Sequence, residues 1–119
     1  MALVPTLTIN DTTTFSDEIN FSVTDELTVA TPAQSLSTIA CATDGANSII
    51  VPASASGCYL FVRHTANLSN VVLVENTDDT QFANLKAGEW MFLPHLSGSL
   101  GVQVQSAAAV VIEYAYWTI

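Results

Sequence analysis

Short runs of β-branched, aromatic and aliphatic residues recur along this chain about every ten residues. The runs at 49–51, 58–64, 71–74 and 90–93 alternate with turn-forming Gly, Asn, Asp and Ser. Val, Ile, Phe, Tyr and Trp favour a pleated strand, whereas the residues between the runs favour tight turns. The spacing therefore predicts an all-β chain, an antiparallel β-sandwich or jelly roll of about eight or nine short strands.

Two segments are less regular. Apolar and polar residues alternate between 15 and 29, but Asp25 interrupts the apolar face, so we expect a bulge or tight turn at 24–26. The alanine-rich segment 34–42 also fits one face of a short helix, and we interpret it as a strand. Because 119 residues is the usual size of one domain, we expect a single β-sandwich domain over 1–119, with an extended N-terminal arm at 1–14.

The stretch WMFL at 90–93 contains no polar side chain. A strand with one solvent-exposed face should alternate apolar and polar residues, because successive side chains point to opposite faces of a sheet. One face of this strand is expected to fill the sandwich. The other must then meet either a crossing loop or a neighbouring subunit.

The charge balance excludes some partners. The chain has 11 acidic and two basic residues, giving a net charge of −9, so we expect no nucleic-acid binding. No run is long enough to cross a bilayer, and residues 1–10 contain no Lys or Arg, so we expect neither a membrane span nor a signal peptide. Charged residues make up only 11% of the chain, against about 25% in an average domain. With 50% hydrophobic residues, we infer burial against other subunits.

Motifs for chemistry are missing from the sequence. The two histidines, His64 and His95, have no HxH or HxxxH spacing, so a metal site is not supported. Cys41 and Cys58 have no CxxC spacing, and we interpret them as buried free thiols, with a disulfide between them as the alternative. Nucleophile elbows and phosphate-binding glycine loops are also lacking. We therefore expect neither catalysis nor a cofactor.

Arg63 is one of only two cations and shares a predicted strand face with Phe61. Arginine is rarely buried without a partner, so we expect a structural ion pair. Glu75 and Glu113 on neighbouring strands are the candidates within the chain. An acidic residue of another subunit is the alternative.

The C-terminal half, CYLFVRHTANLSNVVLVENTDDTQFANLKAGEWMFLP followed by LGVQVQSAAAVVIEYAYWTI, resembles small virion proteins of tailed bacteriophages. The resemblance rests on an order of strands and turns: a YLFVRHT-like strand, an LKAGE-like turn before an aromatic strand ending in Pro, and a final strand with one acidic residue. It implies a capsid decoration (cement) protein on the outer capsid surface, made in the host cytoplasm. Such proteins self-associate, often as homotrimers, and bind across junctions of the major capsid protein.

Other roles fit the same pattern. The resemblance equally implies a tail, baseplate or fibre-tip component, and a lectin-like binding module is a further alternative. For an interface we favour Trp90, Phe92, Tyr114, Tyr116 and Trp117, because aromatic residues concentrate binding energy. Alternation separates Tyr114 and Tyr116 from Trp117, and the sequence leaves open which of these faces is core.

Overall fold

The computed structural model describes residues 2–10, 20–30, 32–41, 48–53, 57–65, 70–96 and 101–119. These residues form twelve strands in four antiparallel sheets and contain no helix. Consequently, a helix able to span a membrane is not found among them. The chain divides into two compact units, Met1–Ala30 and Thr31–Ile119. The boundary at Ala30 lies beyond the arm at 1–14 that the sequence suggested, and each unit is described by itself.

The first unit consists of two short antiparallel ribbons. The strands are β1 (Ala2–Leu3), β2 (Thr6–Asn10), β3 (Asn20–Thr24) and β4 (Leu27–Thr28), with β1 paired to β4 and β2 to β3. The chain leaves β3 at Thr24, where Asp25 was expected to break the alternation. The Asp25 N–H donates to the Pro5 carbonyl (3.2 Å), and the Asp25 carboxylate accepts from the Glu26 N–H (2.8 Å). The expected break at 24–26 is thus confirmed.

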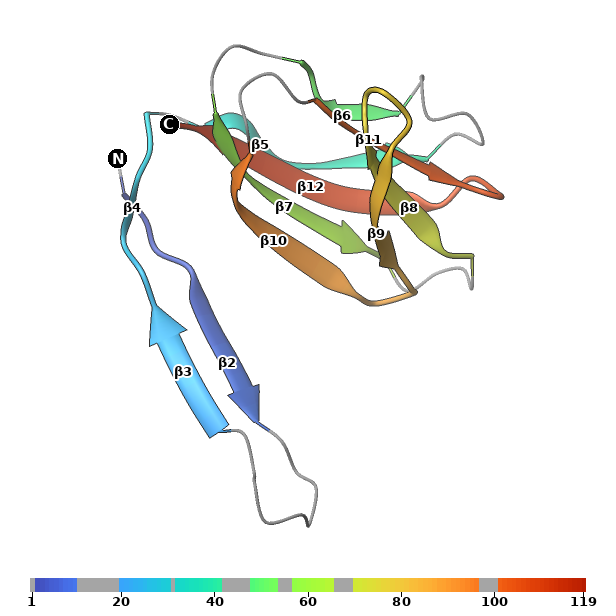
Figure 1. Cartoon of the computed structure of the whole chain (residues 1–119). Coiled ribbons are helices and arrows are strands. Elements are labelled where there is room, and N and C mark those ends of the chain that lie inside the picture. Colours follow the sequence, from blue (N-terminus) through green and yellow to red (C-terminus); the bar gives the residue numbers. More distant parts are fainter. Residues whose placement is uncertain are drawn as a thin grey trace. The chain divides into compact units, whose positions relative to one another are not determined.

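The second unit is a jelly roll. Its strands are β5 (Pro32–Ala40), β6 (Ile49–Val51), β7 (Cys58–His64), β8 (Val72–Asn76), β9 (Gln81–Leu85), β10 (Trp90–Leu96), β11 (Val102–Ser106) and β12 (Val111–Thr118). They form two sheets, ordered β10-β7-β12-β5 and β6-β11-β8-β9 (Figure 1). Pairing joins β5 to β12, β6 to β11, β7 to β10 and β8 to β9, as in a long hairpin rolled into two layers.

This arrangement confirms the predicted all-β sandwich and its jelly-roll form. The ambiguous alanine-rich segment is a strand, since β5 covers most of it and pairs with β12. Eight of the described strands build the sandwich, whereas the predicted eight or nine strands were expected over the whole of 1–119. The four N-terminal strands raise the total to twelve, because the regular alternation before Ala30 builds separate ribbons.

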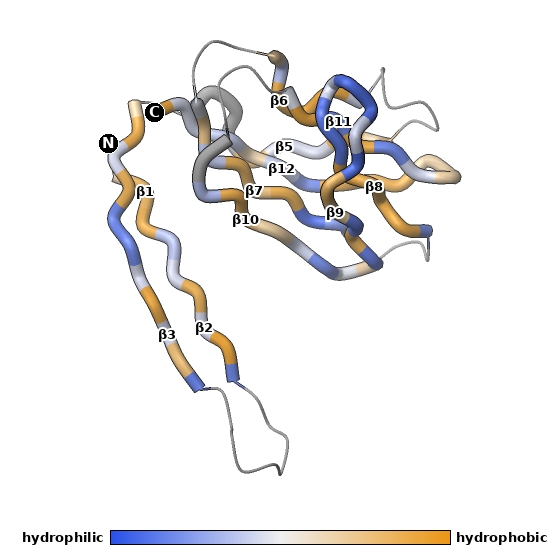
Figure 2. The backbone as a smooth tube through the Cα atoms, in the orientation of Figure 1, coloured by the Kyte–Doolittle hydropathy of each residue, from blue (hydrophilic) through white to orange (hydrophobic). Residues whose placement is uncertain are grey.

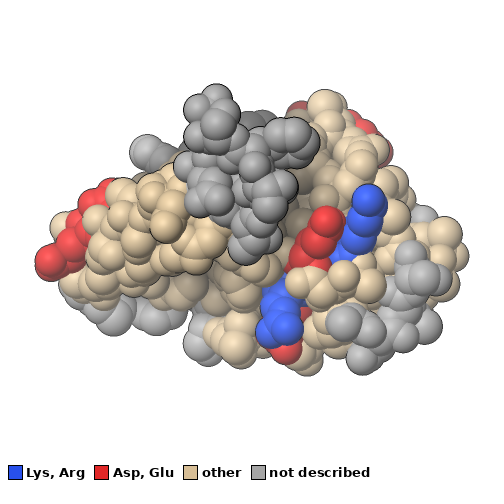
Figure 3. All heavy atoms as spheres, turned by 90° about the horizontal axis from the view of Figure 1, so that it is seen from below, with Lys and Arg blue, Asp and Glu red and all other residues tan. Residues whose placement is uncertain are grey.

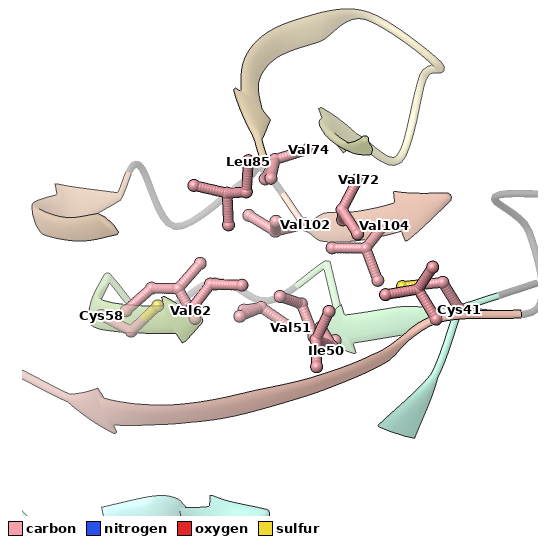
Figure 4. Close-up of a cluster of buried hydrophobic side chains, with 13 residues drawn as sticks. Cys41, Ile50, Val51, Cys58, Val62, Val72, Val74, Leu85, Val102 and Val104 are labelled. Atoms are coloured by element: carbon pink, nitrogen blue, oxygen red, sulfur yellow. The ribbon is translucent and has the colours of Figure 1, made fainter. Parts of the chain in front are cut away.

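The core lies between the two sheets of the second unit. Leu60 and Val62 of β7 and Ile112 of β12 are completely buried on one side. Val74 and Val104 are completely buried on the other. Figure 4 shows side chains of β7 pointing toward those of β8, β9 and β11. Each such aliphatic side chain contributes about 1.5–3 kcal/mol when fully buried, which makes this layer the main source of stability.

Cys41 and Cys58 belong to the same buried cluster and are both free, which is the state favoured from the sequence over a disulfide. Burial raises the pKa of the Cys41 thiol to about 11, and a hydrogen bond from its own backbone opposes this only in part. Burial also raises the pKa of Cys58. Both cysteines therefore behave as small apolar core residues.

Candidate functional site

Strand β7 presents two different faces, and its alternation defines the candidate site. Leu60 and Val62 point into the core, so Tyr59, Phe61 and Arg63 point away from it. In the β10–β7 ladder, Trp90 pairs with Arg63 and Phe92 with Phe61. Residues directly opposite in an antiparallel pair share a face, so both β10 aromatics also point away from the core.

The same register answers the question raised by the stretch at 90–93. Met91 and Leu93 pair with Val62 and Leu60 and pack against the core cluster. Trp90 and Phe92 alternate with them and lie on the outer side of the sheet. The strand is apolar on both sides because one side builds the core and the other builds an outward aromatic surface.

We call this surface the aromatic face and define it by Tyr59, Phe61, Trp90, Phe92 and Trp117. Trp117 belongs to it because it pairs with Tyr59 in the β12–β7 ladder. The rings of Tyr59 and Phe92 are stacked, with centroids 6.2 Å apart and planes 6° apart. Trp90 is the most exposed member, at 54%. The chain has five Phe, three Tyr and two Trp, so half of its aromatic residues lie on one sheet face.

Tyr114 and Tyr116 lie on the opposite side of β12. Both pack against the hydrophobic core, on the same side of the strand as Ile112. Burial raises the pKa of Tyr116, with smaller contributions from the Cys58 and Tyr114 side chains. The five aromatic residues favoured from the sequence therefore separate into three outward and two inward ones. Tyr59 and Phe61 were not among them. Their two-residue spacing from one another and from Arg63 places all three on one face of the strand, and this pattern could have identified them.

A tight turn places Trp90 at the edge of this face. The Glu89 N–H donates to the Lys86 carbonyl (3.0 Å), and Gly88 between them has φ 83°. A positive φ at the third position of such a turn is characteristic of type II and favours glycine. The turn is joined to β7 by hydrogen bonds from the Gly88 N–H to the His64 carbonyl (3.1 Å) and from the His64 N–H to the Glu89 carbonyl (2.9 Å).

Both cations of the protein lie beside the aromatic face. The Arg63 Nη1 atom is 4.0 Å from the Glu113 Oε2 atom, and the two residues pair across the β12–β7 ladder. The Lys86 backbone N–H donates to the Glu89 carboxylate (2.7 Å), and the Lys86 side chain is exposed. Figure 3 shows basic side chains on one face of the molecule with acidic side chains next to them. The surface is therefore locally balanced in charge.

Two open depressions flank Trp90. One has a volume of about 450 Å³ and is lined by Phe61, Arg63, Gly88 and Trp90. The other, about 460 Å³, extends along β9 to Ala83 and also includes Gly88 and Trp90. Trp90 and Gly88 line both depressions, so this edge of the aromatic face is uneven and open, which suits contact with an irregular apolar surface of another protein.

Glu75, the other candidate partner of Arg63, lies in the other sheet. Its Oε1 accepts from Gln103 Nε2 (3.0 Å) and its Oε2 from Gln105 Nε2 (3.1 Å). Gln103 Nε2 also donates to Asp79 Oδ1 (2.6 Å), while Asp79 has φ 61° in the β8–β9 turn. Glu75 and Gln103 are both buried. Two amides therefore satisfy a buried carboxylate, which makes this a structural network.

His64 is the histidine whose side chain lies within the described part of the chain. His64 is completely buried, with Nδ1 2.6 Å from the Thr65 carbonyl and Nε2 2.7 Å from the Asn70 carbonyl. Both ring nitrogens are therefore engaged by the backbone. The side chain of His95 lies outside the described part of the chain. Within that part, His, Cys, Asp and Glu do not gather in a group of three or more that could hold a metal ion.

The first unit carries a second apolar surface, on the β2–β3 ribbon. Leu7 pairs with Val23 and Ile9 with Phe21, so these four side chains share one side, which we call the ribbon face. They are 39–53% exposed. The other side carries hydroxyl groups. The Thr6 and Thr24 hydroxyls are hydrogen-bonded to each other (2.8 Å), as are the Thr8 and Ser22 hydroxyls (3.1 Å). Figure 2 shows the apolar positions recurring along both strands.

Comparison with protein-family models, curated proteins and solved structures finds no match to this chain.

Proposed function

We propose that this chain is a non-enzymatic structural protein of a virion, and that it decorates the capsid of a tailed bacteriophage by binding across junctions of the major capsid protein. The aromatic face is the observation that carries the proposal. Five aromatic side chains on the outer side of one sheet, with Trp90 more than half exposed, are the composition of a protein interface.

The magnitude of the apolar surface supports a structural role. The aromatic face exposes roughly 250 Å² of ring surface, worth about 6 kcal/mol when buried at ~25 cal/mol/Å². Association costs about 4–15 kcal/mol in lost freedom, so this face alone gives weak binding. Repeated contacts across a shell, or a second surface on the same subunit, supply the remainder.

The jelly-roll fold and the net charge of the chain both support a role on the outer surface of a capsid. Jelly rolls occur in viral capsid proteins and also in lectins and cupins, so the fold supports the role only by association. The net charge of −9 disfavours a position against packaged DNA and suits the outer surface. Self-association as a homotrimer and binding to the major capsid protein belong to the same proposal.

The test is the position of the protein in intact particles. Electron cryomicroscopy of virions that carry the chain should show its density at junctions between capsid subunits. Density confined to the tail would overturn the capsid assignment in favour of a tail, baseplate or fibre-tip component.

Matched variants connect this position to the aromatic face. Trp90→Asp should reduce occupancy on purified particles, whereas Phe82→Asp should not, because Phe82 is a comparably exposed aromatic (46%) on β9 of the other sheet. Equal occupancy of both variants would contradict the role given to the aromatic face. Circular dichroism of each variant confirms that the sandwich is folded.

A further inference from the structure

The β2–β3 ribbon needs a cover for its apolar side. A two-stranded ribbon is at best marginally stable alone in water, and three strands or a packed face are usually required. Leu7, Ile9, Phe21 and Val23 are each roughly half exposed, so the ribbon face buries little within its own unit. Burying such a face in another surface would supply the missing stability.

Charge limits what that surface can be. Residues 1–30 contain five acidic residues and no Lys, Arg or His, whereas both basic residues of the chain lie in the second unit. Two ribbons packed face to face would bring together two units of net charge −5 each. Like charges at an interface oppose association, so a ribbon–ribbon contact is disfavoured.

The aromatic face is the surface of this chain that best accepts an acidic, apolar ribbon. Arg63 lies on it, 4.0 Å from the Glu113 carboxylate, and Lys86 lies in the turn before Trp90, where its backbone N–H donates to the Glu89 carboxylate. Figure 3 shows basic and acidic side chains next to one another on one face. The other four acidic residues of the second unit, Asp44, Glu75, Asp78 and Asp79, have no Lys or Arg left to balance them. The depressions on both sides of Trp90 offer room for aliphatic and aromatic side chains.

We propose that the ribbon face of one copy docks on the aromatic face of a second copy, beside Arg63 and Lys86. The contact is heterologous, because it joins two different surfaces of the same chain. Each copy can therefore give one ribbon and receive one, which produces a closed ring such as a trimer if the rotation closes. The inference deepens the proposed structural role and rests on the need for a protein cover over the aromatic face. It makes a second copy the cover of that face, so Trp90→Asp would lower particle occupancy by preventing assembly of the oligomer that binds the capsid.

The available area is close to what such a contact needs. Each surface offers roughly 250 Å² of exposed apolar side chain. Since interfaces are about 57% apolar, the complete contact would bury on the order of 900 Å², close to the ~1,000 Å² that marks a specific interface. In a closed ring each subunit takes part in two such contacts, one through its ribbon face and one through its aromatic face, so the area that each subunit buries is doubled.

Sedimentation velocity of the purified full-length chain, across a concentration series, tests the proposal without particles. The unmodified protein should self-associate, and Phe21→Asp and Trp90→Asp should each weaken association by about tenfold or more, because each places a charge in the contact. Phe82→Asp, on the other sheet, should associate like the unmodified protein. Circular dichroism confirms that all three variants are folded.

Mixing the two variants is the decisive step. Phe21→Asp retains an intact aromatic face and Trp90→Asp an intact ribbon, so an equimolar mixture should form a one-to-one complex that neither forms alone. A chain that stays a single copy at all concentrations would overturn the proposal. Self-association of Trp90→Asp at the unmodified level would also do so, because it indicates ribbon–ribbon pairing. These outcomes are independent of particle binding, which tests the capsid role separately.

Discussion

Replacing Gln103 by Leu should lower the free energy of unfolding by about 2–4 kcal/mol. Gln103 Nε2 donates to the buried Glu75 carboxylate (3.0 Å) and to Asp79 (2.6 Å). A hydrogen bond to a charged group contributes roughly 1.5–3 kcal/mol, and removing the donor leaves a buried carboxylate oxygen without it. Asp79 is exposed and regains water, so most of the loss comes from Glu75.

Urea unfolding monitored by circular dichroism measures this effect, and two further variants locate it. Gln105→Leu removes the donor to the other Glu75 oxygen (3.1 Å) from a less buried position, so its cost should be smaller. In the Glu75→Leu, Gln103→Leu double variant the carboxylate is gone, and the second substitution should cost much less than it does alone. A loss under about 0.5 kcal/mol for Gln103→Leu, or strictly additive costs, would refute the view that this amide stabilises a buried charge.

Two further stability predictions follow from the turn and the buried thiol. Gly88→Ala should destabilise the protein by about 1 kcal/mol, because φ is 83° there, and equal urea midpoints for the variant and the unmodified chain would contradict the turn assignment. Cys41 has a folded pKa of about 11 against an ordinary 9.0, so folded and unfolded thiols are both neutral below pH 9. Above pH 9 only the unfolded thiol ionises, and stability should fall by about 1.4 kcal/mol per pH unit until pH reaches the folded pKa. Cys41→Ala should remove this part of the decline, and identical pH profiles would argue against a buried neutral thiol.

The strand composition of the sandwich could be predicted because local patterns determine it. Apolar runs separated by turn residues indicated most of its strands, and Asp25 marked the end of β3, but these runs did not indicate a strand at β9 (Gln81–Leu85). The extent of the N-terminal unit could not be read in this way. Alternation at 19–23 is the same in a sandwich strand and in an isolated ribbon, and only the pairing partner distinguishes them. That partner is β2, so the unit extends to Ala30.

The aromatic face was only partly predictable, because alternation separates two faces but does not orient them. For β12 the sequence divided Tyr114 and Tyr116 from Trp117, and the ladder with β7 shows that the two tyrosines face the core. Phe61 lies on the outer side because its neighbours Leu60 and Val62 are completely buried. The tertiary register thus supplies the orientation that a single strand lacks.

The position of β12 between β5 and β7 affects how the protein is made. The ribosome makes β12 after the other strands of the sandwich, so the sheet β10-β7-β12-β5 cannot form until this segment has emerged. Until then β5 and β7 lack the strand that separates them, and their unpaired edges are open to other nascent chains. Pairings between strands distant in the sequence also form slowly. Synthesis at lower temperature or slower initiation should therefore raise the yield of folded protein more than changes to the mature surface.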